Sequence, residues 1–187
     1  MRWTINLFFS SLLIGLMVGC GGNDQPKPKA LLRLQYPEPL YNSIPDQYPF
    51  GFEYNRWAIL KELQKSAPEL YYPKMKATLY LSYVAVQNNI DSLLNDAYQL
   101  PGKHMIKAVE IPERIFQDPQ HRVFGTLFTV VGNAASQLQF FLTDSTDHFL
   151  MGSLYFYSRP NYDSIMPAAK YVERDVMHLM ETLRWKD

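Results

Sequence analysis

The sequence has little cysteine and no excess of either charge. Cys20 is the only cysteine among 187 residues, so no disulfide can form within the chain. Eighteen Lys and Arg residues balance eighteen Asp and Glu residues. A nucleic-acid partner would require a basic surface, and this composition therefore argues against one.

No apolar run is long enough for a comfortable membrane span. The longest candidate covers residues 5–18 and is interrupted by Asn6, Ser10 and Ser11. A spanning helix needs about 20 predominantly apolar residues. A shorter apolar segment behind a basic residue, here Arg2, is instead typical of a secretory signal.

The only cysteine directly follows this apolar segment. Met17-Val18-Gly19-Cys20 matches the bacterial lipobox, with Met17 where the pattern prefers Leu. We therefore predict that residues 1–19 are a signal peptide and that Cys20 becomes a lipidated N-terminus. Two or three acyl chains anchor a protein stably without a transmembrane helix. The expected product is a cell-envelope protein bound to a membrane through its lipid.

Two segments rich in Gly or Pro separate this cysteine from the folded body. Residues 20–32 have the composition of a flexible tether. Residues 33–49 contain four prolines and are predicted to form an irregular arm of a single domain, residues 33–187. The side chains expected to pack this arm against the domain are Leu34, Tyr36, Leu40 and Tyr41.

Alternating and helical periodicities predict an α+β fold with a mainly antiparallel sheet covered by helices. Residues 58–65 fit either a helix or a strand. In the strand over 137–143, Gln137 and Gln139 are expected to form a polar face. Ser164 is a plausible N-cap of the last helix, on which His178 is expected to be solvated. The expected strands are 50–54, 77–84, 122–131, 137–143 and 149–157, and the expected helices are 90–100, after Asn89, and 165–183.

The sequence contains no G-x-S-x-G, H-E-x-x-H, C-x-x-C or Gly-rich phosphate-binding motif. Its four histidines, His104, His121, His148 and His178, are scattered along the chain. We therefore expect no enzyme activity and no cofactor.

Two polar loops bracket the strand over 137–143. The first contains Asn133 and Ser136, and the second contains Asp144, Asp147 and His148. Their places at opposite ends of one strand argue against a shared Ser-His-Asp site. The second loop fits either a metal site or a turn in which Asp and Ser bond their own backbone. We expect Asn133 to fix its turn in a left-handed conformation and His148 to lie nearer an interaction surface.

Aromatic residues make up 14% of the chain, and tyrosine is the commonest of them. Tyrosine-rich strands are able to form a face that stacks on sugars or contacts a protein partner. They also arise simply from the preference of tyrosine for sheets. The sequence leaves both interpretations open.

A long central string carries a family resemblance. Residues 132–136, 139–140, 142–146, 148–150, 152 and 154–156 resemble the GldD gliding-motility lipoproteins of Bacteroidota, as do 77–83, 160–161, 163–165, 181–183 and 185. The likeness is poor between Trp57 and Tyr72. The resemblance implies an envelope lipoprotein associated with gliding and type IX secretion, and it supplies no catalytic residue. The order of elements also resembles the Mog1/PsbP-like α/β/α sandwich.

Two functional hypotheses follow. The first is a non-catalytic component or assembly factor that binds envelope proteins of the motility and secretion machinery. The alternative is a periplasmic lipoprotein that binds a small ligand or glycan. Gly21 follows the cysteine where an inner-membrane retention signal would have Asp, and Asp24 is the only acidic residue nearby. We therefore expect the periplasmic face of the outer membrane.

The predicted anchor is tested by Cys20→Ala, which removes the thiol that would carry the lipid. We expect the variant to lose lipid attachment and to be released or misprocessed. Membrane fractionation and intact-mass measurement check this outcome. Recovery of Cys20→Ala in the membrane fraction at the normal mature mass would contradict the lipidation.

Overall fold

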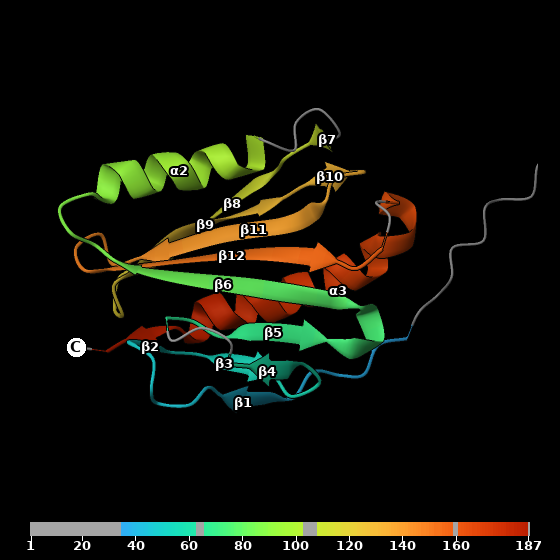
Figure 1. Cartoon of the computed structure of the whole chain (residues 1–187), viewed down its shortest axis with the longest axis horizontal. Coiled ribbons are helices and arrows are strands. Elements are labelled where there is room, and N and C mark those ends of the chain that lie inside the picture. The colour runs from blue at the N-terminus through green and yellow to red at the C-terminus, as the bar shows by residue number, and fades with distance from the viewer. Residues whose placement is uncertain (1–34, 63–65, 103–107, 159–160, 187) are drawn as a thin grey trace, which may run out of the picture. The chain divides into compact units, whose positions relative to one another are not determined.

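The computed structural model describes residues 35–62, 66–102, 108–158 and 161–186 (Figure 1). All of them belong to one compact unit of the chain, Leu32–Asp187. The predictions for the signal, for Cys20 and for the tether concern residues outside this description, as do those for Leu34 and His104.

The centre of the fold is a seven-stranded sheet in which every pair of neighbours is antiparallel. The strands in spatial order are β4 (Ile59–Lys61), β5 (Glu69–Tyr72), β6 (Ala77–Ala85), β12 (His148–Phe156), β11 (Ser136–Thr143), β9 (Val123–Thr129) and β8 (Glu113–Asp118). Short connections leave no room for a crossover between β4 and β5, β5 and β6, β8 and β9, and β11 and β12, whereas β6 and β12 pair although α2 (Ile90–Gly102) and several strands separate them in the sequence.

One helix lies on each face of this sheet. Helix α3 (Tyr162–Thr182) covers one face, and α2 (Ile90–Gly102) crosses the other (Figure 1). Because side chains alternate along a strand, Leu138 and Phe140 join the core under α3, whereas Phe141 joins a smaller core under α2. The prediction of an α+β fold with a mainly antiparallel sheet is confirmed. The likeness to Mog1 and PsbP stays a prediction.

Strand β11 is buried along its whole length. It pairs with β12 on one side and β9 on the other, and a helix lies over each of its faces. The prediction of a polar face was therefore wrong, since Gln137 and Gln139 are 1% and 3% exposed.

A close contact fixes the register at the middle of the sheet. Phe140 on β11 lies directly opposite Gly152 on β12. A Cβ atom at Gly152 would overlap the ring of Phe140. Glycine is therefore required at this position because the ring occupies the space of its missing side chain.

The proline-rich arm, which was predicted to be irregular, contains a short strand. Strand β1 (Tyr41–Ser43) pairs with β3 (Glu53–Asn55), and β2 (Phe50–Gly51) pairs with β13 (Arg184–Trp185) near the C-terminus. The single strand predicted over 50–54 is thus two short strands with different partners. Tyr36 packs against the core as expected, but Leu40 is 50% exposed.

Other element boundaries depart modestly from the predictions. The uncertain segment after Ala58 contains strand β4. Strands β5, β7 (Ala108–Glu110) and β8 and the short helix η1 (Pro73–Met75) have no counterpart among the predictions. The strand predicted over 122–131 is divided between β9 and β10 (Val131–Gly132).

Both long helices begin without the expected side-chain caps. Asn89 precedes α2, but its Oδ1 accepts the N–H of Gln87 at 2.8 Å. Helix α3 begins at Tyr162, ahead of Ser164, whose N–H donates to the carbonyl of Asn161. The prediction of Ser164 as N-cap was therefore wrong.

A buried carboxylate joins the arm to α3. Asp175 is 4% exposed, and its Oδ2 accepts a hydrogen bond from Asn55 Nδ2 at 2.9 Å. The hydroxyl of Tyr41 donates to Oδ1 at 3.3 Å, and the same Asn55 amide donates to Tyr171. Burial raises the pKa of Asp175, because these neutral donors do not replace its lost hydration.

Contacts with Tyr41 and Glu53 leave the side chain of His178 only 27% exposed, less than the solvated position that was predicted. Its Nε2 lies 2.7 Å from Glu53 Oε2, and its ring stacks on Tyr41 with centroids 3.6 Å apart. The β1–β3 hairpin covers this part of α3, which the helical periodicity alone marks as an outer face.

Leu179 on α3 is 1% exposed and lies in the main core. Leu179→Ala should lower the free energy of unfolding by about 2–5 kcal/mol, as expected for a buried large-to-small change. Leu40→Ala is the matched control, expected to change it by no more than about 0.5 kcal/mol because Leu40 is half exposed. Denaturant unfolding measures both, and equal effects would show that the packing of α3 has been misassigned.

Candidate functional site

The two predicted polar loops lie at opposite ends of β11. Ser136 is the first residue of this strand, and Asp144 follows its last residue. The eight-residue strand separates them, so the two loops do not form one site. Each loop therefore has to be understood through its own contacts.

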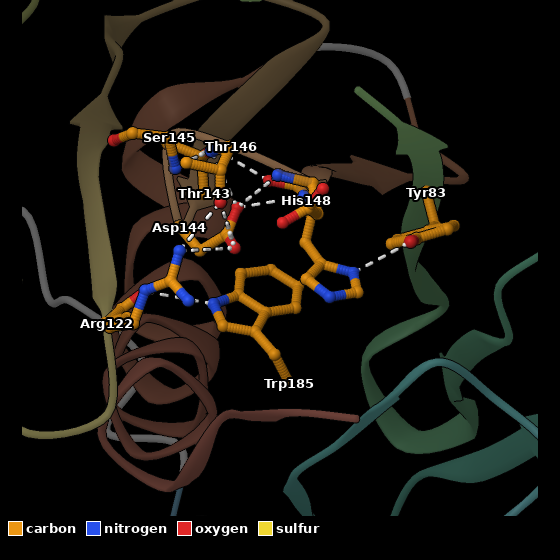
Figure 2. A network of polar contacts seen from close by, with 9 residues as sticks. Tyr83, Arg122, Thr143, Asp144, Ser145, Thr146, His148 and Trp185 are labelled. Carbon is orange, nitrogen blue, oxygen red and sulfur yellow. Dashed lines mark hydrogen bonds and ion pairs between the residues drawn. The ribbon is translucent and has the colours of Figure 1, made fainter. Parts of the chain in front are cut away.

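Asp144 organises the second loop by accepting hydrogen bonds from the loop's own backbone (Figure 2). Its Oδ1 accepts the N–H groups of Thr146, Asp147 and His148 at 3.0, 2.9 and 2.9 Å. Its Oδ2 accepts the hydroxyl of Thr146 at 2.8 Å and Arg122 Nη2 at 3.3 Å. Asp in a turn commonly bonds the backbone that follows it, and this loop is an extended case.

These donors determine the charge of Asp144. Burial by itself raises the pKa of this carboxyl, but the hydrogen bonds from His148, Asp147 and Thr146 outweigh it and lower the pKa to about 2. The side chain is only 3% exposed. Asp144 is therefore a buried, ionised carboxylate whose lone pairs are engaged within the loop.

Neighbouring side chains add further hydrogen bonds that hold this loop. Thr143 Oγ1 accepts the N–H of Ser145 at 2.9 Å and donates to the carbonyl of His148 at 2.7 Å. Ser145 adopts a left-handed backbone with φ 69°. Arg122 Nη2 also donates to Thr146 Oγ1 at 2.7 Å.

His148 joins the loop to two other elements (Figure 2). Its Nδ1 lies 2.8 Å from the hydroxyl of Tyr83 on β6, and its ring stacks on Trp185 of β13 with centroids 5.0 Å apart. The indole Nε1 of Trp185 donates to the carbonyl of Arg122 at 3.0 Å. His148 is thus half-buried between two aromatic residues.

The metal interpretation of this loop does not fit its geometry. Both oxygens of Asp144 already accept hydrogen bonds, and Asp147 contributes its backbone N–H while its side chain is exposed. Across the part of the chain that the structure describes, no three His, Cys, Asp or Glu residues are placed to hold a metal ion. The contacts support the self-bonded turn.

The first loop is also structural, but by a different device from the one expected. Gly132, with φ 135°, has the left-handed backbone that was predicted for Asn133. Asn133 Oδ1 instead accepts the N–H of Tyr162 at 2.8 Å, at the first turn of α3. Asn133 therefore caps a helix that begins 29 residues later. Ser136 is fully buried, and its hydroxyl donates to the carbonyl of Leu138.

A third feature, the tyrosine face, lies on the part of the sheet beside α2. Helix α2 packs over Phe128, Phe141 and Phe149. The β4–β5–β6 side and the end of β12 carry large exposed side chains on the same face. This tyrosine face consists of Ile59, Tyr71, Tyr80, Tyr155 and Tyr157, of which Ile59 is 52%, Tyr80 36%, Tyr155 37% and Tyr157 54% exposed.

Hydrogen bonds and ring contacts hold the tyrosine face in place. The hydroxyl of Tyr157 lies 2.8 Å from that of Tyr80 and 2.9 Å from Thr78 Oγ1. The rings of Tyr80 and Tyr155 meet edge to face at 5.8 Å. The hydrogen bond that Tyr80 donates to Tyr157, together with partial burial, raises the pKa of Tyr80 to about 12, whereas the hydrogen bonds from Thr78 and Tyr80 lower the pKa of Tyr157. The face therefore presents phenol rings that are held in position by their own contacts.

The sequence indicated tyrosine-rich strands but not that these residues would gather. Strand register brings them together, because Tyr71, Thr78 and Tyr155 lie opposite one another on β5, β6 and β12. Strand β5 falls in the segment with the poorest family likeness and was not predicted. The face is exposed because α2 covers the other half of the same sheet surface, and the sequence does not indicate which half a helix covers.

These features define an α+β domain with two polar loops that are held by hydrogen bonds within the domain and with an exposed tyrosine face. No helix of the described residues is long and apolar enough to cross a membrane. The family model for the gliding motility lipoprotein GldD matches residues 21–185, and the chain belongs to this family. Membership makes it a lipid-anchored envelope protein and a component of gliding motility. No curated protein matches the sequence.

The lowered pKa of Asp144 predicts a pH-dependent contribution to stability. The contribution is present above the unfolded pKa of 3.8 and is lost as the pH falls toward about 2. Asp144→Asn should therefore lower the free energy of unfolding by about 2 kcal/mol at pH 7, and the difference should shrink toward pH 2. Asp147→Asn, at an exposed neighbour, is the control. A pH-independent difference for Asp144→Asn would exclude the charge as its cause.

The remote cap predicts unequal effects of two asparagines at the start of α3. Asn133→Ala removes the acceptor of the Tyr162 N–H and should cost about 1 kcal/mol. Asn161 stands at the N-cap position but makes no side-chain cap bond, so Asn161→Ala should have little effect. Thermal and denaturant unfolding compare the two. A larger effect at Asn161 would reverse the assignment.

Proposed function

We propose that this lipoprotein is a non-catalytic component or assembly factor of the gliding and type IX secretion apparatus. In this proposal it binds another envelope protein through the tyrosine face. The observation that carries the proposal is the group of exposed, pre-positioned aromatic side chains on the sheet surface beside α2.

The chemistry of this face suits a protein partner. Tyrosine is enriched in protein interfaces because it offers a large apolar ring together with a hydroxyl. The bonds among Tyr157, Tyr80 and Thr78 reduce the rotamer freedom that a partner would otherwise have to restrict. Lys61, whose Nζ lies 4.3 Å from the ring centre of Tyr71, adds a cation at the β4–β5 edge.

The two polar loops support a non-catalytic role. A general acid, base or nucleophile needs a lone pair or proton available to a substrate. Asp144 uses both oxygens to hold its own loop, and Asn133 uses its oxygen to cap α3. Asp144 and Asn133, which lie in the part of the sequence that most resembles the family, therefore stabilise the fold.

The proposed location is the periplasmic face of the outer membrane, with Cys20 as the lipidated residue. Gly21 after the cysteine and the single nearby acidic residue, Asp24, support it. The match to a lipoprotein family supports a lipid anchor. A triacylated cysteine would keep the domain on one leaflet.

The proposal is tested with the double variant Tyr80→Ser and Tyr155→Ser in a gliding host. We expect the free energy of unfolding to stay within about 1 kcal/mol, since both side chains are over one-third exposed, while gliding is lost. Ile115→Ser is the control, because Ile115 is 72% exposed on the distant edge strand β8. A photo-reactive phenylalanine at position 155 should form a covalent adduct with one envelope protein.

The same experiment addresses the glycan alternative. A normally folded double variant that still glides would overturn the tyrosine face as the partner site. Loss of gliding without any protein adduct, accompanied by saturable binding of soluble envelope glycan fragments to the unmodified protein, would favour the glycan-binding lipoprotein instead.

A further inference from the structure

Cationic and aromatic side chains gather at the start of the arm, beside the short helix η1. Trp57 is 42% exposed, and Arg56 Cζ and Lys74 Nζ lie 5.7 and 5.4 Å from the centre of its ring. Leu40, which is 50% exposed, adjoins them because its carbonyl accepts the N–H of Arg56 at 2.7 Å. We call this group the basic aromatic patch, and it consists of Glu38, Leu40, Arg56, Trp57, Lys74 and Arg174.

Contacts within the domain hold Trp57 at the surface. Its indole Nε1 donates to the carbonyl of Glu38 at 3.2 Å, and its backbone N–H donates to Asn55 Oδ1 at 3.1 Å. Trp57 also lines an apolar cavity of about 130 Å³ together with Met75 and Tyr171. The indole is therefore anchored on the protein side and remains partly open to solvent, the amphipathic arrangement that suits an interface between water and lipid.

The basic aromatic patch carries a net positive charge. Three cations, Arg56, Lys74 and Arg174, accompany one carboxylate, Glu38, for a net charge of +2. Glu38 Oε2 lies 3.9 Å from Arg174 Nη1, so these two charges offset each other, while Arg56 and Lys74 are both exposed. Because the whole chain has equal numbers of basic and acidic residues, the positive charge of this patch is a local feature.

The chain that leads to the proposed lipid enters the domain at this patch. Tyr36 and Pro37 line the same cavity as Trp57. Cys20 stands sixteen residues before Tyr36, a separation that spans at most about 55 Å even in a fully extended chain. Residues 21–35 add three basic side chains and one acidic side chain. The patch is thus the part of the domain surface to which the anchor is most directly connected.

We propose that the basic aromatic patch docks on the surface of a bilayer that contains anionic phospholipid. This inference rests on the proposed lipidation of Cys20. Trp57 enters the interfacial layer, where indole rings are favoured, and Arg56 and Lys74 are attracted to the phosphate groups. Leu40 adds apolar contact. Because the anchor already confines the domain near the bilayer, an attraction too weak to recruit a free protein is sufficient.

Docking through this patch leaves the tyrosine face available to a protein partner. Tyr72 and Tyr171, which line the cavity beside Trp57, belong to the core under α3, whereas the tyrosine face lies on the α2 side of the sheet. The two surfaces therefore work independently. The variant carrying Tyr80→Ser and Tyr155→Ser should dock normally.

Quenching of tryptophan fluorescence by lipids with brominated acyl chains measures the docking. The full chain, purified with its lipid, is reconstituted into vesicles of equal parts phosphatidylglycerol and phosphatidylcholine. Removal of residues 1–19 leaves Trp57 and Trp185 as the tryptophans. In the Trp185→Phe variant, which keeps an aromatic ring beside His148, we expect a blue shift and loss of most Trp57 emission. Phosphatidylcholine vesicles or high salt should restore the emission.

Trp185 is the matched control within the same chain. It stacks on His148 at one end of β12, whereas Phe156 at the other end lies opposite Ala77, just after η1. A strand of nine residues spans about 30 Å, so Trp185 lies far from a bilayer that contacts the patch. In the Trp57→Phe variant, the brominated lipids should leave the Trp185 emission unquenched.

The double variant Arg56→Gln and Lys74→Gln tests the charge. Both side chains are exposed, so the unfolding midpoint should not change. Loss of two cations should lower the ratio of docked to undocked domain by about tenfold on the anionic vesicles. Arg114→Gln is the control, because Arg114 is 58% exposed on β8, at the other edge of the sheet, and it should leave the quenching unchanged.

Four results would overturn the docking. The chain floats with the anionic vesicles but Trp57 is not quenched, or Trp57 and Trp185 are quenched equally. The double variant and Arg114→Gln have equal effects. A photo-reactive phenylalanine at position 57 forms an adduct with one envelope protein or a second copy in the native envelope, instead of with lipid. Failure of the proposed lipidation is distinguishable, because the chain would then not float with vesicles at all, and this docking would fall with it.

Discussion

The enclosure of β11 is the constraint on which the rest of the structure depends. This strand has no free edge, because β12 and β9 flank it, and no free face, because α2 and α3 lie over its two sides. A strand confined in this way holds the loops at its two ends at fixed positions. It also forces Gln137 and Gln139 into the interior, where each leaves an acceptor unused.

The two buried aspartates show how different surroundings set different charges in one small domain. Asp144 receives three backbone N–H groups and remains ionised well below its usual range, with a pKa of about 2. Asp175 receives only side-chain donors, and its burial raises the pKa. Acid therefore destabilises the loop that Asp144 organises, while it relieves the desolvation of Asp175 beneath the arm.

The sequence was most informative where the pattern was local. Helix α3 and strands β6, β9, β11 and β12 follow from apolar periodicity, and the two polar loops were placed at opposite ends of one strand. The failures come from long-range contacts. The helical periodicity of α3 places His178 on the outer side of the helix, but it does not show that the hairpin containing Tyr41 and Glu53 covers that side. Strand β8 mixes charged and apolar residues, so its pairing with β9 left no clear signal.

The candidate sites divide in the same way. Local chemistry offered a self-bonded turn as one of two interpretations of the loop at Asp144, and the contacts support that one. The role of Asn133 was not predictable, because its partner, Tyr162, is distant in sequence and is brought near only by the packing of α3. The tyrosine face depends on which part of the sheet each helix covers. A single sequence does not contain that information in any local pattern.

The contact between Phe140 and Gly152 makes substitutions at these two positions depend on each other. The ring fills the volume that a side chain at 152 would need, and the two residues face each other at the centre of the sheet. A methyl group gained at 152 would be tolerated only after the residue at 140 had become smaller, and a smaller residue at 140 alone would leave a void. Each order of substitution passes through a damaged intermediate. Relatives should therefore retain the pair or have exchanged both members together.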